Sequence, residues 1–194
     1  MEAKIIFMKK MTIIIAIEGI DGSGKTTFAV ELARHLGFSY QNFPDRSAAV
    51  TGKIIDQALK GESSLSSTEL AIIFASNRRE CIEKLKRNVV VDRYVLSGKV
   101  YALANGVSEE AVNELDRDVP EPNLTIFINT PVEDALKRRR NGSEIFENEE
   151  FQRKVNDLFW KNIPDNTIFV SNNDSYSDVF AKISAVVEGF KLHI

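Results

Sequence analysis

The sequence predicts an α/β protein whose core is a doubly wound sheet of five parallel strands flanked by helices. Short apolar runs are the first observation, because strands buried on both faces of a parallel sheet are apolar nearly throughout. Longer amphipathic stretches separate these runs, which is the alternation of a doubly wound fold. A glycine-rich segment directly follows the first run, at a strand end where such folds bind ligands.

The strands are expected where apolar, mostly β-branched runs are bounded by Gly, Pro or Asn. They are residues 12–18, 38–43, 88–92, 124–129 and 166–171. The helices are expected at residues 24–36, 47–60, 66–87, 93–105, 131–140, 147–162 and 176–190. At the fifth of these helices, Thr130 stands at the cap position and Pro131 in the first turn, an arrangement that favours a helix start.

The chain has 194 residues and is 43% hydrophobic, which suits one packed domain. We expect this domain to span residues 11–194, after a leader of residues 1–10 and with a lid at residues 138–150. The apolar run before Glu18 is short for a signal peptide and ends without a small-residue cleavage site. No stretch approaches the length of an apolar membrane span, so we expect a cytoplasmic protein that does not bind membranes.

Charge and cysteine content narrow the function classes further. The net charge of −3 disfavours a general nucleic-acid-binding or membrane-surface protein. Cys81 is the only cysteine, so it cannot form an internal disulfide. Its helical context favours a buried structural thiol.

The segment GIDGSGKT, residues 19–26, matches the pattern G-x-x-x-x-G-K-[ST] between a predicted strand and a predicted helix. Its glycines let backbone N–H groups converge on phosphate, and the helix N-terminus adds its positive end. Lys25 can reach the β- and γ-phosphates, and the Thr26 hydroxyl can bind Mg²⁺. This context predicts a P-loop NTPase-type fold, against the alternative of a glycine-rich turn without a ligand. The residues predicted to contact the triphosphate are Gly19, Asp21, Gly22, Ser23, Gly24, Lys25, Thr26 and Thr27.

Asp92 ends the predicted strand 88–92, where a carboxylate can hold Mg²⁺ through water; a turn aspartate without a ligand is the alternative. Together with Thr26 it predicts the metal site. A GTPase would need an Asn-Lys-x-Asp motif after a late strand. Residues 171–174 read Ser-Asn-Asn-Asp instead, with no lysine, which disfavours GTP.

Further residues predict a second ligand beside the triphosphate. Arg46 follows the second predicted strand at its carboxyl end, where an arginine suits a phosphate. Phe74 and Arg78 are four residues apart and share one helix face. A ring and a cation together can stack on a flat base and donate to its carbonyl; a core phenylalanine with a surface arginine is the alternative.

The stretch after Asp92 adds three more candidates. Arg93 leaves the same strand end as the proposed magnesium carboxylate and could bridge donor and acceptor phosphates. Ser97 and Tyr101 follow, one helical turn apart.

Taken together, these motifs resemble the thymidylate kinase family. They run in the family's order over nearly the whole chain, from about Ile13 to the C-terminal helix. Adenylate, guanylate and shikimate kinases share the first motif but not the combination. The segments that carry the resemblance are GIDGSGKTT, FPDRS, FASNRRE, DRYVLSG and ALKRRRNGSEIFENEEFQRKV.

The resemblance implies transfer of a phosphoryl group from ATP to dTMP, with Mg²⁺ as cofactor, by a homodimer formed through helices. It implies that Arg46 holds the 5′-phosphate of dTMP, that Phe74 stacks on thymine and that Arg78 binds its 4-carbonyl. It also implies that Phe43 borders the acceptor and that the Phe43–Pro44 peptide bond is cis.

The remaining acceptor residues carry over in the same way. Arg93 would contact the acceptor phosphate and the transferred group. Tyr101 would pack under the deoxyribose and exclude a 2′-hydroxyl, with Ser97 near the base. Asp21 would accept a hydrogen bond from the 3′-hydroxyl and help to hold the acceptor-side arginines.

The chemistry needs no general base, because the acceptor phosphate oxygen is already ionised at neutral pH. Charge neutralisation by cations should therefore supply catalysis, and we assign no role to His35 or His193. The residues expected to be catalytic are Lys25, Arg93, Arg139 and Arg140.

Residues 137–140 read Lys-Arg-Arg-Arg, which in isolation predicts a solvated helix end. The resemblance implies instead an arginine-bearing lid that closes over the phosphates. Arg138 would stack on adenine, and Arg139 or Arg140 would reach the γ-phosphate. Gly22 stands where some relatives carry a catalytic arginine, so the missing cation must come from the lid.

Two positions depart from the family pattern. Ile145 stands where many members have a lid arginine, and Asn123 stands where an aspartate is usual. Two alternatives therefore remain open. One is a related nucleoside monophosphate or deoxynucleoside kinase, and the other is a non-catalytic nucleotide-binding regulator with a degraded lid.

Overall fold

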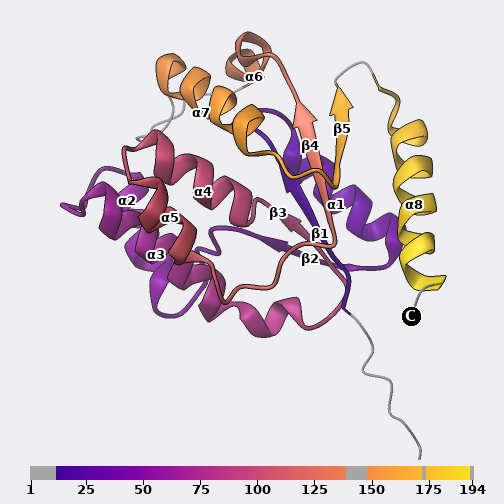
Figure 1. Ribbon diagram of the computed structural model, residues 1–194, viewed down its shortest axis with the longest axis horizontal. Coiled ribbons are helices and arrows are strands. Elements are labelled where there is room, and N and C mark those ends of the chain that lie inside the picture. Colours follow the sequence, from indigo (N-terminus) through magenta and orange to yellow (C-terminus); the bar gives the residue numbers. More distant parts are fainter. Residues whose placement is uncertain (1–11, 139–147, 172–173, 193–194) are drawn as a thin grey trace, which may run out of the picture.

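The structure is a computed structural model that describes residues 12–138, 148–171 and 174–192. Its sheet has five strands in the order β2-β3-β1-β4-β5, and every neighbouring pair is parallel (Figure 1). The strands are β1 (Ile14–Glu18), β2 (Ser39–Asn42), β3 (Val89–Asp92), β4 (Leu124–Asn129) and β5 (Thr167–Ser171). The predicted doubly wound α/β fold and all five strand positions are confirmed.

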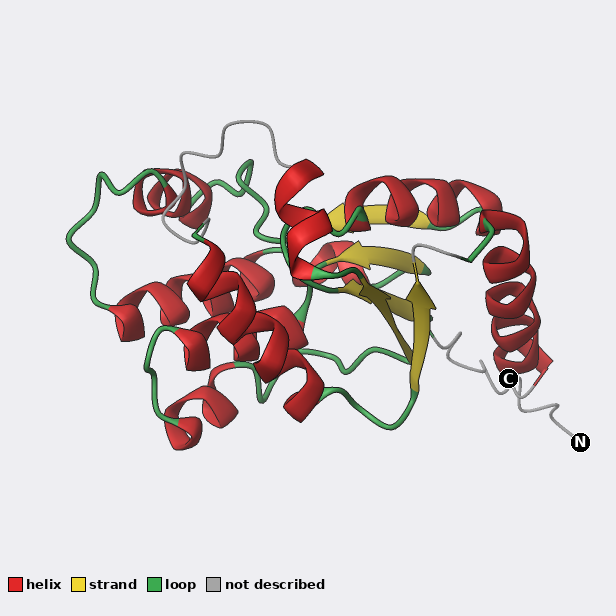
Figure 2. Ribbon diagram, turned by 90° about the horizontal axis from the view of Figure 1, so that it is seen from above, coloured by secondary structure: helices red, strands yellow, loops and turns green. Residues whose placement is uncertain are grey.

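Helices cover both faces of this sheet (Figure 2). They are α1 (Lys25–Leu36), α2 (Thr51–Leu59), α3 (Ser67–Glu80), α4 (Val95–Ala104), α5 (Glu109–Leu115), α6 (Val132–Arg138), α7 (Glu149–Asn162) and α8 (Tyr176–Leu192), with the 3₁₀ turn η1 (Ile82–Leu85). Within the described residues, no helix is long and apolar enough to cross a membrane.

The central strand β1 is buried on both faces. Ile15 and Ile17 belong to a core cluster with Phe28 of α1 and Ile183 of α8. Ile14 belongs to a second cluster on the other side, beside the end of α3 and η1. Because successive side chains of a strand point to opposite faces, this double cover requires an unbroken apolar run.

Three helix predictions need correction. Helix α3 ends at Glu80 rather than at residue 87, because the chain turns at Cys81 into η1. Helix α2 begins at Thr51 rather than at residue 47. The Asp45 carboxylate accepts hydrogen bonds from the Ser47 N–H (2.9 Å) and hydroxyl (2.6 Å), and such local bonds compete with a helix.

The third correction is helix α5, which the sequence analysis missed. Its cap residue Ser108 accepts a hydrogen bond from the Ala111 N–H at 3.3 Å. Two glutamates follow the serine, and serine followed by acidic residues is a known helix-start signal. The sequence thus contained the signal, but the segment is short and weakly patterned.

The carboxyl ends of β1, β2 and β3 meet at one edge of the sheet. The register pairs Ile17 of β1 and Asn42 of β2 with Asp92 of β3. The loops that follow these three strands therefore emerge side by side, and they carry the residues of the predicted site.

Candidate active site

One cavity of about 580 Å³ gathers residues from the loops after β1, β2 and β3, from helices α3 and α4, and from the end of α6. Its volume lies in the range of small-molecule sites. The predicted site residues that line it are Asp21, Gly22, Gly24, Lys25, Thr26, Thr27, Phe43, Arg46, Phe74, Arg78, Asp92, Arg93, Ser97, Tyr101 and Arg138. Gly19 and Ser23 lie in the same loop behind the lining, and Arg139 and Arg140 fall outside the described residues.

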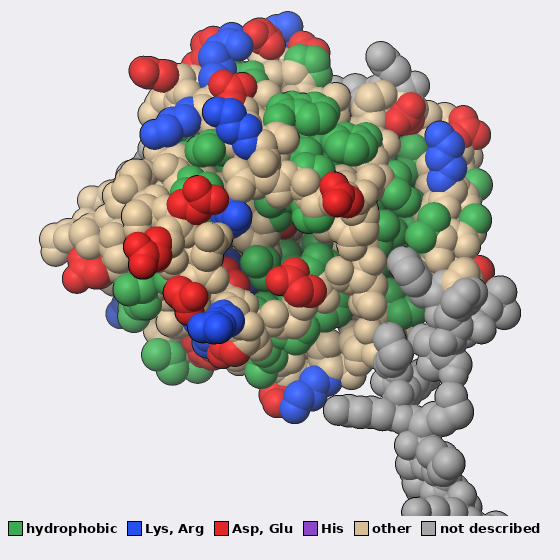
Figure 3. Space-filling view, viewed as in Figure 1, with side chains coloured by type: hydrophobic (Ala, Val, Ile, Leu, Met, Phe, Trp, Pro, Cys, Tyr) green, Lys and Arg blue, Asp and Glu red, His purple; other side chains and the backbone are tan. Residues whose placement is uncertain are grey.

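The charge of this lining differs from that of the chain as a whole. On the face seen in Figure 3, acidic and basic side chains are interspersed. Among the described residues, by contrast, the cavity lining carries five basic side chains and two acidic ones. An acidic protein that concentrates cations in one cavity is suited to a phosphorylated ligand.

The phosphate loop has the backbone that its glycines predict. Gly22 and Gly24 have φ angles of 79° and 91°, in the left-handed region that favours glycine. A Cβ atom on Gly19 would lie 2.8 Å from the carbonyl oxygen of Ile128, so only glycine fits there. Gly24 caps α1 without a side-chain hydrogen bond among the described residues, which leaves the helix N-terminus available for an anion.

Lys25 folds back into this loop. Its ammonium donates hydrogen bonds to the Ile20 carbonyl and to the Ser23 hydroxyl, the latter at 3.3 Å. Burial, together with repulsion by Arg93, lowers the pKa of Lys25 to about 7. A phosphate in the loop would favour the charged form, so the geometry suits the predicted role.

The two predicted metal residues meet directly. The Thr26 hydroxyl donates to Oδ2 of Asp92 at 2.6 Å, and the Tyr40 hydroxyl approaches the same oxygen at 3.4 Å. The other oxygen, Oδ1, is buried and has no hydrogen-bond partner within the described part of the chain. A hydroxyl beside an unsatisfied carboxylate oxygen is a donor set that fits Mg²⁺.

Asp21 turns toward α4 and α7. It forms an ion pair with Arg93 and accepts hydrogen bonds from the Tyr101 hydroxyl (2.9 Å) and the Gln152 amide (3.0 Å). In return, the Gln152 side-chain oxygen accepts from the Asp21 N–H at 3.1 Å. The phosphate loop is thereby tied to α4 and α7, and the negative charge of Asp21 is compensated.

Arg93 lies between Asp21 of the phosphate loop and Tyr101 of α4. It adopts a φ of 61°, and among the described residues it is the one non-glycine residue with positive φ. Burial by itself would lower the pKa of Arg93, but the attraction of Asp21, Tyr101, Asp92 and Glu18 together outweighs it, so the net shift is upward. Its guanidinium carbon also lies 5.2 Å from the centre of the Tyr101 ring. A strained backbone that places a fixed cation between two halves of a cavity is typical of functional sites.

Phe74 and Arg78 share one face of α3, as predicted, since both line the cavity. Arg78 is buried, which excludes the alternative of a surface arginine. Asp116 fixes its guanidinium through two hydrogen bonds of 2.8 and 2.6 Å. A Cβ atom on Gly98 would lie 2.5 Å from that guanidinium, so the glycine of α4 makes room for it.

In the loop after β2, Arg46 is partly exposed and pairs with Asp56 of α2 at 2.9 Å. The Phe43–Pro44 peptide bond that precedes it is cis, as expected. Phe43 is buried against Tyr94, with ring centres 5.9 Å apart.

Sequence reasoning missed Glu18, which is fully buried at the end of β1. Its carboxylate accepts hydrogen bonds from the N–H groups of Tyr94 (3.0 Å) and Ser97 (3.2 Å) and from the Ser97 hydroxyl. It thus caps the N-terminus of α4 from another element, and burial raises its pKa. A carboxylate that closes an apolar strand could have signalled this role.

Comparison with known proteins agrees with this geometry. The family model described as Thymidylate kinase matches residues 17–183 of the chain. The chain is 30% identical to the thymidylate kinase of Dictyostelium discoideum, over 93% of this chain and 87% of that protein. It is 32% identical to the thymidylate kinase of Schizosaccharomyces pombe, over 93% of each.

A solved structure gives the same result for the fold. The thymidylate kinase of Candida albicans, described as having broad substrate specificity, matches with a TM-score of 0.78. The match covers 94% of both chains at 29% sequence identity. The cavity, its motifs and these similarities all agree: the chain belongs to the thymidylate kinase family.

Proposed function

We propose that this protein transfers the γ-phosphoryl group of ATP to dTMP, giving ADP and dTDP. The observation that carries the proposal is the pair of Asp21 and Arg93. This pair joins a nucleotide phosphate loop to a second set of residues, in one cavity, that suits a base and a phosphate. A site for one nucleotide alone would not need the second set.

The proposed catalysis rests on position and charge. The 5′-phosphate oxygen of dTMP attacks the γ-phosphorus of ATP, and the bond from that phosphorus to the bridging oxygen of ADP breaks. Lys25 and Arg93 neutralise the charge of the moving group. The ATP phosphates lie in a cradle formed by the loop residues Gly19, Gly22, Ser23, Gly24 and Thr27.

Thr26 and Asp92 would hold Mg²⁺ in this proposal. Bound there, Mg²⁺ would supply positive charge against the phosphates. The unsatisfied oxygen of Asp92 supports this assignment.

For the acceptor, we propose that Arg46 binds the 5′-phosphate and that Phe74 and Arg78 hold thymine. Asp21 accepts from the 3′-hydroxyl, and Tyr101 packs under the sugar. Phe43 and Ser97 complete the acceptor site. The cavity lining, which includes all of these residues, supports this arrangement.

For the donor, Arg138 is proposed to stack on adenine, and its position in the cavity lining supports this. The catalytic role of Arg139 and Arg140 and the lid at residues 138–150 are proposals from the family resemblance. The single domain of residues 11–194 is a proposal from the length and composition of the chain. The cytoplasmic location stays a prediction.

We also propose a homodimer. Helices α2 and α3 pack together, and each carries a large exposed apolar side chain, Ile54 and Ile72. Val50, just before α2, is 70% exposed. Such side chains are costly on a monomer surface when they lie together. Light scattering of the purified chain measures the mass directly, and a monomer at micromolar concentration would contradict this proposal.

A steady-state panel of acceptors tests the reaction. Release of ADP should depend on dTMP and should be much weaker with AMP or CMP. Equal rates with dTMP and UMP would contradict the role of Tyr101 in excluding a 2′-hydroxyl. ATP binding without any dTMP-dependent turnover would favour a regulator instead.

The Arg46→Ala variant separates a nucleotide acceptor from a nucleoside acceptor. A nucleoside brings no phosphate for Arg46 to hold. We therefore expect a large rise in the KM for dTMP and an unchanged KM for ATP. If the KM for dTMP barely changes, the assignment of Arg46 fails.

A further inference from the structure

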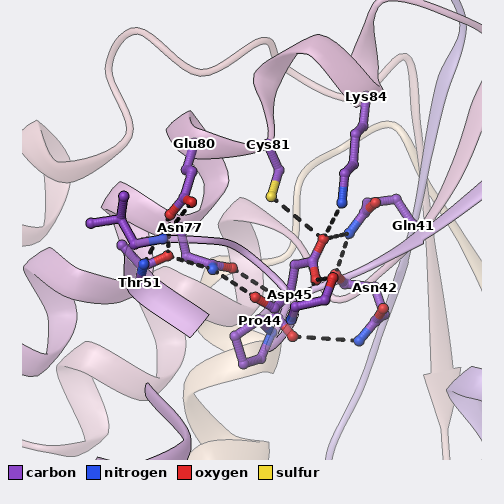
Figure 4. A network of polar contacts seen from close by, with 11 residues as sticks. Gln41, Asn42, Pro44, Asp45, Thr51, Asn77, Glu80, Cys81 and Lys84 are labelled. Atoms are coloured by element: carbon purple, nitrogen blue, oxygen red, sulfur yellow. Dashed lines mark hydrogen bonds and ion pairs between the residues drawn. The ribbon is translucent and has the colours of Figure 1, made fainter. Parts of the chain in front are cut away.

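The loop that carries Arg46 is held by a buried polar network in addition to the apolar packing of Phe43 and Ala48. We call residues 43–50 the acceptor loop. Asn77 of α3 is 0% exposed and lies against it. Its amide oxygen accepts from the Asp45 N–H at 2.7 Å, and its amide nitrogen donates to the Asp45 carbonyl at 2.9 Å (Figure 4). One side chain thus satisfies both backbone groups of the residue that precedes Arg46.

The Asp45 side chain secures the loop from the opposite side. Its carboxylate accepts hydrogen bonds from Gln41 (3.1 Å), from Ser47 and from the Lys84 ammonium (Figure 4). Burial would raise the pKa of Asp45, but these donors outweigh it and hold the pKa well below the usual range. The carboxylate therefore stays charged at neutral pH and can keep accepting from these three donors.

A second arm of the network reaches α2. The amide nitrogen of Asn77 also donates to the Thr51 hydroxyl at 2.7 Å, and that hydroxyl donates to Glu80 at 2.7 Å. Glu80 in addition accepts from the N–H groups of Val50 (2.8 Å) and Thr51 (3.0 Å), so α3 caps the first turn of α2. Helix α2 carries Asp56, the ion-pair partner of Arg46.

Close backbone packing, as well as hydrogen bonding, holds the acceptor loop against α2. A Cβ atom on Gly52 would lie 2.3 Å from the carbonyl oxygen of Arg46. The backbone of Arg46 therefore rests directly on the first turn of α2, which Glu80 and Thr51 tie to α3.

We propose that Asn77 is a positioning residue that sets the distance between the phosphate-binding and base-binding ends of the acceptor site. Helix α3 carries Phe74 and Arg78 toward the base end, and through Asn77 the same helix holds the peptide unit that leads to Arg46. The positions of the base-binding and phosphate-binding ends are thus both set by one rigid helix, α3. The inference rests on the proposed role of Arg46 as the ligand of the acceptor phosphate.

The choice of side chain supports a positioning role. An apolar residue at position 77 would leave the N–H and carbonyl of Asp45 buried without partners, which is costly. A nucleotide has a nearly fixed span between its base and its 5′-phosphate. Loss of Asn77 should therefore weaken the binding of a ligand that uses both ends, and spare a ligand that uses only the base end.

The test compares dTMP with thymidine, which lacks the phosphate, by calorimetric titration of the full chain. In Asn77→Ala we expect the Kd for dTMP to rise by about tenfold, while the Kd for thymidine stays within about twofold. Thr51→Val removes only the hydroxyl that links Asn77 to Glu80, and should give a smaller loss of the same kind. Ser76→Ala, a neighbour in α3 bonded to the Ile72 carbonyl, should change neither affinity.

The inference is wrong if Asn77→Ala weakens both ligands equally, which would indicate a merely structural role, or if it weakens neither. If Asn77→Ala does not fold, Thr51→Val decides in the same way: a selective loss for dTMP supports the inference, and an equal loss or no loss overturns it. Arg46→Ala separates the two proposals. If Arg46→Ala does not weaken dTMP binding selectively, the proposed phosphate role of Arg46 is wrong. If Arg46→Ala does weaken dTMP binding selectively but the Asn77 variant does not, only the inference about Asn77 fails.

Discussion

At the scale of single residues, Asp21 explains how a carboxylate can occupy a phosphate loop. Two like charges about 5 Å apart repel by roughly 3 kcal/mol at an effective dielectric constant near 20. Asp21 avoids this cost because its oxygens face Arg93, Tyr101 and Gln152 instead of the phosphate cradle. The carboxylate instead orients the Arg93 cation at the centre of the site.

The variant Asp21→Ala should therefore damage the acceptor side far more than the donor side. Removal of one partner of a buried charged pair costs about 2–5 kcal/mol, so we expect kcat/KM for dTMP to fall by about a hundredfold. The Kd for ATP should change little. Steady-state kinetics with varied dTMP and a separate titration with ATP measure the two effects.

Asp21→Asn is the matched control for this prediction. It keeps an acceptor oxygen for Tyr101 and removes only the charge that holds Arg93. Its loss of activity should be smaller than that of the alanine variant. A larger effect on ATP affinity than on dTMP turnover in either variant would refute the acceptor-side role.

Cys81 gives a prediction about pH. Burial and the nearby Asp45 carboxylate raise the pKa of its thiol to about 11, above the ordinary value of 9.0. The native thiol should therefore resist alkylation at mildly alkaline pH and react only after unfolding. This shift also makes stability depend on pH. The Cys81 thiol of the unfolded chain loses its proton at a lower pH than the thiol of the folded chain. The contribution of the protonated thiol to stability therefore declines as the pH rises above about 9. Iodoacetamide labelling with and without urea measures the reactivity, and fast labelling of the folded chain at pH 8 would contradict the burial of this thiol.

At the scale of elements, α3 is the organising helix of the acceptor site. Its cavity-facing side chains, Phe74 and Arg78, differ from those that hold α2 and the acceptor loop, Asn77 and Glu80. The start of α3 is strongly specified, since Ser66 and Glu69 form a reciprocal capping box. A fixed start sets the rotation of the helix and hence which residues reach the cavity.

The contact between α3 and α4 can be tested at Gly98. A methyl group there would meet the Arg78 guanidinium at 2.5 Å, and Arg78 cannot yield without breaking its pair with Asp116. Gly98→Ala should lower the free energy of unfolding by about 1–3 kcal/mol. It should also raise the KM for dTMP by about tenfold without affecting ATP, because the base-binding arginine is displaced.

Gly189→Ala is the matched control in another helix. A Cβ atom on Gly189 of α8 has no heavy atom of the described residues within 4 Å. Alanine is favoured over glycine in a helix interior by up to about 1 kcal/mol, so this variant should be neutral or more stable. Urea denaturation compares both variants, and equal stability of the two would contradict the close packing at Gly98.

At the scale of the whole molecule, nucleotide binding should raise the melting temperature in two separable steps. A ligand at a hundredfold excess over its Kd stabilises the native state by about 2.7 kcal/mol. For a chain of this size that corresponds to about 5–10 °C. Thermal scans should show one increase with dTMP and another with ATP and Mg²⁺.

Asp92→Asn should remove the part of the ATP effect that requires Mg²⁺ and leave the dTMP effect in place. Chelation by EDTA should do the same to the native protein. If the variant kept a full response to Mg²⁺, the assignment of Asp92 to the metal would fail. Loss of the dTMP response would indicate that the substitution had disturbed the whole site.

The sequence alone predicted the sheet because its signals are local. An apolar run such as residues 124–129 and a glycine-rich loop with the right spacing need no knowledge of the rest of the chain. The cavity residues followed because parallel strands end at one edge, so the motifs after β1, β2 and β3 had to meet.

The site residues that the sequence did not predict are ones that contact partners far away along the chain. Asp116 fixes Arg78 from 38 positions away, and Gln152 binds Asp21 from 131 positions away. Glu18 caps a helix that begins more than seventy positions later. None of these partners is visible in a local pattern, because topology alone brings them together.

The cover of α1 by α8 has a consequence for the synthesis of the protein. Phe28, close after the phosphate loop, packs against Phe180 with ring centres 5.4 Å apart, and Val179, Ile183 and Val187 complete the same cluster. On the ribosome, the part of this cluster that α8 covers therefore stays exposed until the last described helix has emerged. A nascent chain should expose this apolar surface to chaperones until α8 has left the exit tunnel.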